Sequence, residues 1–371
     1  MKYTIPILFA LSLFLGKGSD CFWDKWAPLR YQKTLERAPE FYVLEWKEGA
    51  SLSPKTSDMY IEVDTLGNQE ILVLSDKRDN PVLYTSEIVT PVCADGECKM
   101  MNIQLYWTLL GEYAGFDRYP ELPLTKHDHD EFGKEDYLKL HDLLKDDKSI
   151  LGRRSINQLV EKPTMRTVNG VDALSGATIA EVKESVVSGA LYSCYTAWHL
   201  VHGKIDKKLK KHTLGILNET MLMDMLYSKN PDYQLFALEK LNVSQYEDHY
   251  LQIATIFKTG IPLVRSIIAK ELPSKFKSSP ELEKPFWDAF GVIDLGSRSL
   301  LLKHLEDAPQ FAVLTVSDKL SALSKNQLKR FLEYISQQDL TPEVQSNMEA
   351  FANSDNETYG YLVQEFLSNH N

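Results

Sequence analysis

The pattern of apolar residues changes abruptly near residue 203, and this change most limits the possible fold. Before it, short segments rich in β-branched and aromatic residues are separated by Gly, Asn-Pro and Asp-Gly breaks, which is typical of strands. These segments span residues 59–65, 70–76, 81–92 and 100–111. After it, only segments with helical periodicity follow. The sequence therefore predicts an α+β domain followed by an all-α domain.

Two helices are expected inside the α+β region. In residues 134–146, Tyr137, Leu140, Leu143 and Leu144 fall on one helical face. A longer helix is predicted from about residue 179 to residue 202, because apolar residues recur there every three to four positions. The basic segment "KIDKKLKKH" at 204–212 is expected to be a solvated linker. The α+β domain is thus predicted to span residues 19–203 and the all-α domain residues 204–371.

The all-α region contains eight helical segments that alternate with Pro, Asn and Asp breaks. They span residues 220–228, 232–241, 248–257, 261–272, 281–290, 297–307, 324–337 and 359–369. Their pairing at roughly 40 residues favours stacked helical hairpins of the HEAT or armadillo kind. A plain, irregular helical bundle fits the same pattern equally well.

The first 18 residues have the features of a secretory signal peptide. Lys2 precedes the apolar run "IPILFALSLFL", which is followed by small residues. We therefore expect export to the periplasm or the extracellular space. No internal run reaches the roughly 18 apolar residues of a membrane span, so an integral membrane protein is not expected. The formal charge of −11 makes nucleic acid an unlikely partner.

Export places the cysteines in an oxidising compartment. Cys93 and Cys98 lie symmetrically about the Asp-Gly turn of "CADGEC", so a disulfide across a hairpin is predicted, with a redox-active dithiol as the alternative. Cys194 lies at core spacing in the long predicted helix and is expected to be a buried thiol.

Familiar catalytic and metal motifs are missing from the sequence. No HExxH, CxxC, GxSxG, Walker A loop or GxGxxG occurs. His127 and His129 alternate in an extended segment but have no suitably spaced partner, so no metal site is predicted. No catalytic residue is predicted either.

The stretch "VDALSGATIAE" at 171–181 carries the strongest functional signal. Thr178 and Glu181 fit the T-x-x-E capping box of a helix N-terminus. A capping box does not account for Asp172, Ser175, Gly176 and Ala177. Small residues just before a helix let a ligand approach the backbone, and free amides there attract phosphate. The second interpretation of this stretch is therefore a phosphate-binding site that includes the hydroxyl of Thr178.

The segment D-A-L-S-G-A-T resembles the D-x-x-[ST]-G-A-T flavinylation motif of FMN-binding domains, such as those in the sodium-translocating NADH:quinone reductase and the Rnf complex. In that family the threonine is joined to FMN through a phosphoester by a flavin transferase that consumes FAD and needs magnesium. The resemblance implies that Thr178 is the attachment point and that Asp172 is the acidic residue the transferase recognises. Ser175, Gly176 and Ala177 would form the close-approach segment.

The resemblance implies an exported flavoprotein that transfers electrons, with a flavin transferase and a redox protein as partners. Tyr192, Tyr195 and Trp198 follow the motif and either pack near the flavin ring or belong to the core. The alternative is a non-catalytic extracytoplasmic binding protein, in which a flavin-free FMN-type domain is joined to helical repeats that hold a partner. Family members usually carry Ser or Thr two residues after the attachment threonine, where this chain has Ala180.

Overall fold

A computed structural model describes residues 34–63, 67–92, 100–126, 130–160, 180–354 and 358–370 of the chain. The chain divides into two compact units, one ending at Ile216 and the other beginning at Leu217. The first unit contains a sheet and helices, and the second is helical. This agrees with the predicted order of an α+β part followed by an all-α part.

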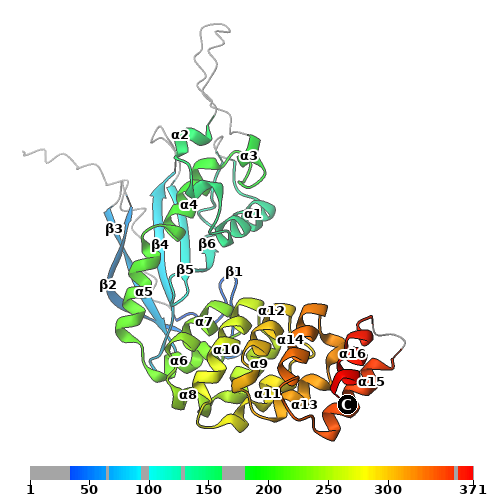
Figure 1. The fold of residues 1–371 in the computed structure, drawn as a ribbon. Helices are drawn as coiled ribbons and strands as arrows, with labels where there is room; N and C mark the ends of the chain where they lie inside the picture. Colours follow the sequence, from blue (N-terminus) through cyan, green and yellow to red (C-terminus); the bar gives the residue numbers. More distant parts are fainter. Residues whose placement is uncertain are drawn as a thin grey trace, which may run out of the picture. The chain divides into compact units, whose positions relative to one another are not determined.

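A six-stranded antiparallel sheet forms the centre of the first unit, within the part of the chain that the structure describes. Its strands are β1 (Phe41–Tyr42), β2 (Ser53–Val63), β3 (Gly67–Ser75), β4 (Pro81–Pro91), β5 (Met100–Trp107) and β6 (Tyr113–Arg118). Their order across the sheet is β1-β6-β5-β4-β3-β2 (Figure 1). The four predicted strand segments are confirmed as β2 to β5. β6 was not predicted, because its sequence contains Gly115, where a side chain would overlap the backbone of Phe41 in β1.

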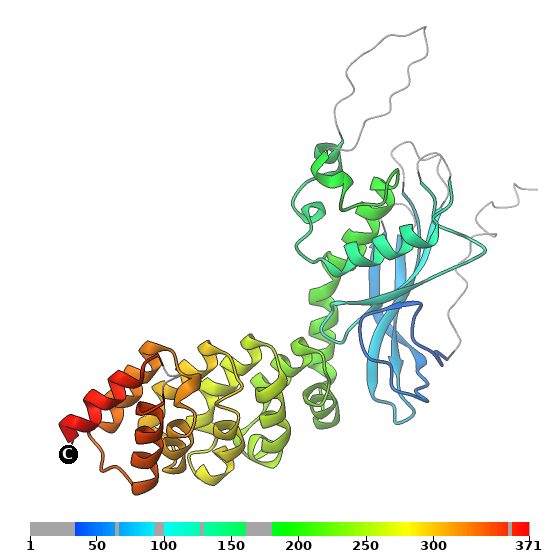
Figure 2. The same cartoon turned by 90° about the vertical axis from the view of Figure 1, so that its right-hand side faces the viewer.

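One face of the sheet is covered by α4 (Leu191–His202) and α5 (Ile205–Ile216). Trp107 of β5 donates its indole N–H to the carbonyl of Val201 in α4, at 3.2 Å. Tyr84, which is opposite Trp107 in the sheet, hydrogen-bonds to Thr213 in α5. In Figure 2 the green helices α4 and α5 run along one side of the blue strands. Every second residue of β4 and β5 points to this face of the sheet and is therefore buried under the two helices.

The opposite face is covered at one end by the chain that precedes β2. Leu35 and Leu52, which pair in an isolated bridge, pack against the sheet residues Leu74, Leu83 and Tyr106. All five side chains are at most 5% exposed. The sheet thus has apolar packing on both faces at this end.

The predicted helix at 134–146 is confirmed as α1 (Lys134–Lys145), and its four predicted inward residues are all buried. Three ring N–H groups of α4, from Trp198, His199 and His202, donate to backbone carbonyls at and after the end of α1. The acceptors are the carbonyls of Asp146, Leu151 and Leu144, at 2.9, 3.1 and 2.8 Å respectively. The last carbonyls of a helix have no partner within the helix, so α4 supplies partners that α1 lacks. Two short helices, η2 (Ile150–Gly152) and α2 (Ile156–Leu159), follow.

The single long helix predicted from 179 to 202 is wrong. The structure has a short helix α3 (Ala180–Lys183), then turns, then α4. Gly189 adopts a left-handed conformation with φ of +73°, which ends the possibility of a continuous helix. The apolar periodicity continued across the break because Val182, Val186 and Val187 are all buried, although the last two lie in turns.

The linker predicted at 204–212 is also wrong, since these residues form most of α5. Ile205, Leu209 and Thr213 are buried at four-residue intervals, and the lysines between them are on the outer side. α5 packs on the turn between β5 and β6, where Gly111 has a φ of +85°. The boundary between the two units therefore lies between Ile216 and Leu217 and not between residues 203 and 204.

Helices alone make up the described part of the second unit. The longer ones are α6 (Glu219–Leu226), α7 (Pro231–Lys240), α8 (Val243–Asp248), α9 (Tyr250–Thr259), α10 (Pro262–Lys275), α11 (Lys284–Asp288), α12 (Leu295–Lys303), α13 (Phe311–Ser317), α14 (Lys325–Ile335), α15 (Pro342–Ala352) and α16 (Gly360–His370). Short 3₁₀ turns lie at η3 (Pro280–Glu283), η4 (Leu305–Asp307) and η5 (Leu320–Ala322). Several of these helices are capped by a side chain that accepts a hydrogen bond from an N–H group of the first turn, which fixes where the helix begins. The capping residues are Asn218, Asn230, Asn242, Asp294, Ser324 and Thr341.

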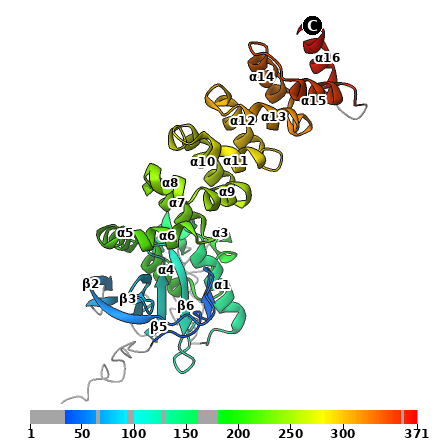
Figure 3. The ribbon, with the colours of Figure 1, turned by 90° about the horizontal axis from the view of Figure 1, so that it is seen from below.

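These helices stack in two layers (Figure 3). In one layer α10 packs on α12, α12 on α14 and α14 on α16; in the other α9 packs on α11, α11 on α13 and α13 on α15. All eight predicted segments coincide with helices, whereas α8, α13 and α15 were not predicted. α13 was missed because its sequence "FAVLTVS" is rich in β-branched residues, which favour strands. The helices α10, α12, α14 and α16 begin at residues 262, 295, 325 and 360, so the predicted spacing of roughly 40 residues is too long.

Replacing Gly111 with alanine should weaken the docking of α5 on the sheet. The new Cβ would lie 2.7 Å from the Cα of Asp206, and the positive φ adds strain. Gly49 has a similar φ of +71° but open space around its Cα, so Gly49→Ala is the matched control for the backbone strain. We expect Gly111→Ala to lower the free energy of unfolding by roughly 2 kcal/mol or more, and Gly49→Ala by about 1 kcal/mol. Equal losses in urea titrations of the two variants would contradict this packing.

The stability of the first unit should fall as the pH drops from 7 to 5. Burial lowers the pKa of His141, His199 and His202 below the ordinary value of 6.5. The folded unit therefore binds fewer protons than the unfolded chain below about pH 6.5, and acid favours unfolding. Urea titrations at several pH values measure this effect. His202→Gln keeps an N–H donor but cannot titrate, so its stability should depend less on pH than that of the wild type; an unchanged pH dependence would contradict the assignment.

Candidate functional site

The residues predicted to carry flavin lie outside the described residues. This holds for Asp172, Ser175, Gly176, Ala177 and Thr178, and for the side chain of Glu181 in the capping box. It holds equally for Cys93 and Cys98 and for the predicted signal peptide at 1–18. The disulfide, the signal peptide and both interpretations of Thr178 therefore stay predictions.

The chain directly after the motif is held firmly on the first unit. α3 begins at Ala180, and Val182 and Val187 are 0% exposed. The N–H of Val187 donates to Sγ of Cys194 at 3.4 Å, and burial raises the pKa of this thiol to about 12. The prediction of a buried Cys194 is confirmed. The C-terminal side of the motif is thus anchored through α3 and α4.

The three aromatic residues of α4 differ in their surroundings. Trp198 is 6% exposed, donates to Asp146, and has Gly152 against its ring, so it belongs to the core. Tyr192 and Tyr195 are half-buried. Of the three, only the tyrosines retain surface that a ligand could contact.

A polar groove runs between the edge strand β2 and helix α5. Two adjoining cavities of about 470 and 460 Å³ share Asp58, Tyr60 and His212. The charged groups that line these two cavities are Lys55, Lys208, Lys211, Asp58, Glu62, Glu70 and Asp79. The groove therefore presents both signs of charge along its length.

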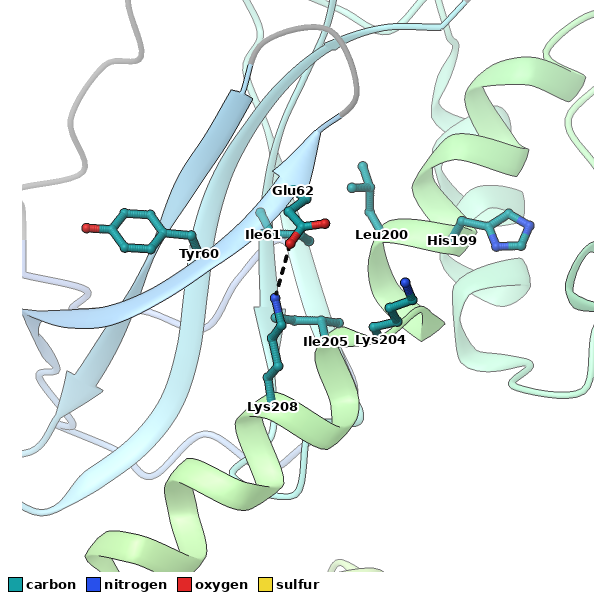
Figure 4. Close-up of a pocket in the computed structure, with 8 residues that line it drawn as sticks. All are labelled: Tyr60, Ile61, Glu62, His199, Leu200, Lys204, Ile205 and Lys208. Atoms are coloured by element: carbon teal, nitrogen blue, oxygen red, sulfur yellow. Dashed lines mark ion pairs between the residues drawn. The ribbon is translucent and has the colours of Figure 1, made fainter.

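A smaller cavity of about 140 Å³ lies where α4 meets α5 (Figure 4). Lys208 of α5 reaches across it to Glu62 of β2, at 3.8 Å. Figure 4 shows Tyr60 and His199 turned away from this ion pair, on opposite sides. Lys208 and Glu62 line both this smaller cavity and the cavity of about 470 Å³, so the ion pair borders both of them.

His212 is oriented by a chain of buried hydrogen bonds. Thr213 donates its hydroxyl hydrogen to the carbonyl of Leu109 at 2.5 Å. The hydroxyl of Tyr84 lies 2.7 Å from that of Thr213, which has no hydrogen left, so Tyr84 must donate to it. Tyr84 must then accept from Nδ1 of His212, 2.8 Å away. In its neutral form His212 therefore carries its hydrogen on Nδ1 and has a free lone pair on Nε2.

The strand side of the groove is shaped by an irregularity in β2. The register between β2 and β3 shifts between Thr56 and Tyr60. The hydroxyl of Ser57 donates to the carbonyl of Ile71 and accepts from the N–H of Met59, so a side chain replaces ladder bonds within the shift. Such bulges redirect the side chains around them. Asp58 and Met59 line the groove at this point.

Sequence reasoning placed none of these residues in a site. His212 lay in the segment taken for a linker, and the four-residue spacing of Ile205, Leu209 and Thr213 was the signal that could have identified α5. The bulge in β2 has no comparable signal, since neither Ser57 nor Met59 is a residue type that marks a bulge within a strand.

Comparisons with protein-family models, with curated proteins and with solved structures give no match. Among the described residues, no group of three or more His, Cys, Asp or Glu side chains is arranged to hold a metal ion. In the same part of the chain, every helix is too short or too polar to cross a membrane.

Removing the hydroxyl of Thr213 should destabilise the first unit. Thr213→Val keeps the shape of this fully buried side chain but removes the hydroxyl that donates to Leu109 O and accepts from the Tyr84 hydroxyl. We expect a loss of about 1–3 kcal/mol in the free energy of unfolding. Thr213→Ser keeps the hydroxyl and serves as the control. If Thr213→Val were as stable as Thr213→Ser, the hydrogen bonds of the Thr213 hydroxyl would not stabilise the first unit.

Proposed function

We propose that this protein is an exported flavoprotein that carries FMN covalently on Thr178 and transfers electrons. The observation that supports it is the motif D-A-L-S-G-A-T at residues 172–178, which combines an acidic residue, small residues and a hydroxyl in the order of the flavinylation motif. When bound, the isoalloxazine supplies the redox chemistry, and the protein supplies attachment and orientation.

The attachment step follows from the chemistry of the motif. The Oγ of Thr178 forms a bond to the phosphorus of the FMN half of FAD, the pyrophosphate bond breaks, AMP leaves, and the hydroxyl proton passes to a base of the transferase or to solvent. Ser175, Gly176 and Ala177 leave the approach to this oxygen open, and Asp172 is proposed to be the contact of the transferase. A covalent bond suits an exported protein, because free FMN would be lost by dilution.

The neighbouring structure is compatible with this proposal. α3 begins two residues after Thr178, and Val182, Val186 and Val187 are buried in the first unit. An attached group would therefore lie close in the chain to residues that are packed into the first unit. We further propose a flavin transferase and a redox protein as partners.

The second unit supports the alternative function, a non-catalytic binding protein. We propose that its two helical layers are HEAT-like repeats that hold a partner. Leu263, Val292 and Leu295 lie at or near the starts of α10 and α12, and are 57%, 66% and 53% exposed. Exposed apolar residues at matching points of successive hairpins are typical of a docking surface. This function does not require flavin.

Variants of Thr178 separate flavin attachment from simple helix capping. The full chain would be exported together with an active flavin transferase and studied by intact mass and peptide mapping. Wild type should gain the mass of FMN on the peptide that contains Thr178 and be yellow. Thr178→Asp keeps an oxygen for capping but no transferable hydroxyl, so it should stay folded and colourless. Thr178→Ser should retain part of the modification.

Wild-type protein without added mass on this peptide would contradict the flavoprotein proposal and favour the alternative. Under the capping interpretation alone, Thr178→Asp would match wild type in every assay, within a few tenths of a kcal/mol in stability.

A further inference from the structure

We propose that the groove between β2 and α5 binds a neutral, polyhydroxylated ligand such as a saccharide. The groove belongs to the first unit, and its two open cavities of about 470 and 460 Å³ have the size of small-molecule sites. The inference does not depend on flavin, because none of the motif residues lines these cavities.

The charges of the groove exclude a strongly charged ligand. Three lysines and four carboxylates line the two cavities, so a polyanion would meet four like and three opposite charges, and a polycation three like and four opposite charges. A mainly apolar ligand would strip water from these charged groups without replacing their hydrogen bonds. A ligand with many hydroxyl groups satisfies both signs, because each hydroxyl can donate to a carboxylate and accept from a lysine.

His212 gives the groove a fixed acceptor. Its Nδ1 is held by Tyr84, whose side chain is 0% exposed, so the ring cannot turn without breaking this partly buried hydrogen bond. The lone pair on Nε2 is left for a donor in the groove. On the same side Lys211 offers N–H donors, and across from it Asn68 offers both a donor and an acceptor. Donors and acceptors thus lie on both sides of the groove, which is an arrangement that the hydroxyl groups of a sugar ring can match.

The opposite wall is also preorganised. The hydroxyl of Ser57 donates to the carbonyl of Ile71 in β3 and accepts from the N–H of Met59, which holds the segment of Asp58 and Met59 at the groove. A preformed wall lowers the entropy cost of binding a small polar ligand.

A glycan array with the full-length protein tests the proposal, followed by calorimetric titration of the best free saccharide. We expect at least one neutral saccharide to bind. His212→Ala should weaken that binding about fivefold or more, as the loss of one neutral hydrogen bond implies. Tyr84→Phe should weaken it through loss of the ring orientation. Because these two residues contact the core, the exposed variants Lys211→Met and Asn68→Ala test the groove without risk to folding.

Lys210→Met is the matched control, since Lys210 is also exposed on α5 but does not line the cavities. It should bind as wild type does. The proposal is overturned if no neutral saccharide binds, if binding survives unchanged in Lys211→Met and Asn68→Ala, or if inorganic phosphate or citrate binds in the groove in place of saccharides. Loss of flavin from Thr178→Asp should leave saccharide binding unchanged, so this proposal and the flavoprotein proposal fail independently.

Discussion

Helices α4 and α5 must keep one face of the sheet from water, and most other features of the first unit depend on how they do so. The helices are held by hydrogen bonds as well as by apolar packing. Trp107 of the sheet donates to Val201 in α4, and Tyr84 of the sheet hydrogen-bonds to Thr213 in α5. Because these polar groups are buried, their partners cannot be exchanged for water at low cost. These hydrogen bonds therefore fix where α4 and α5 lie on the sheet, in addition to stabilising the first unit. The orientation of His212 and the anchoring of the chain after the motif both follow from these positions.

The sheet could be predicted where its strands are long and consist of residues that favour strands. β4 and β5 are long, rich in β-branched and aromatic residues, and bounded by turn residues, so their sequences indicate them clearly. β6 could not be recognised, since Gly115 serves a contact with β1 that only the assembled sheet contains. The same limit applies to α3 and α4. Their apolar spacing is continuous, and the break between them depends on the conformation of Gly189, which the apolar pattern does not indicate.

The two candidate sites differ in how well they could be predicted from the sequence alone. The motif at 172–178 is local, so seven consecutive residues suffice to suggest its chemistry. The groove is not local, because it joins residues of β2 and β3 with residues of α5 that are more than a hundred positions away in the chain. The lysines of α5 looked like a solvated linker because charge is the visible feature there, whereas the buried Thr213 is what ties the helix to the sheet. Only packing revealed that one side of this basic segment forms the wall of a cavity.

The bulge in β2 has a consequence for how the protein behaves in concentrated solution. β2 lies at the edge of the sheet, where unpaired backbone groups could add a strand from another molecule. The register shift between Thr56 and Tyr60 interrupts the regular row of those groups, and Lys55, Asp58 and Glu62 place charge along the strand. A flat neighbouring strand therefore finds no continuous template. The irregularity that shapes one wall of the groove also protects the longest open edge of the sheet against aggregation.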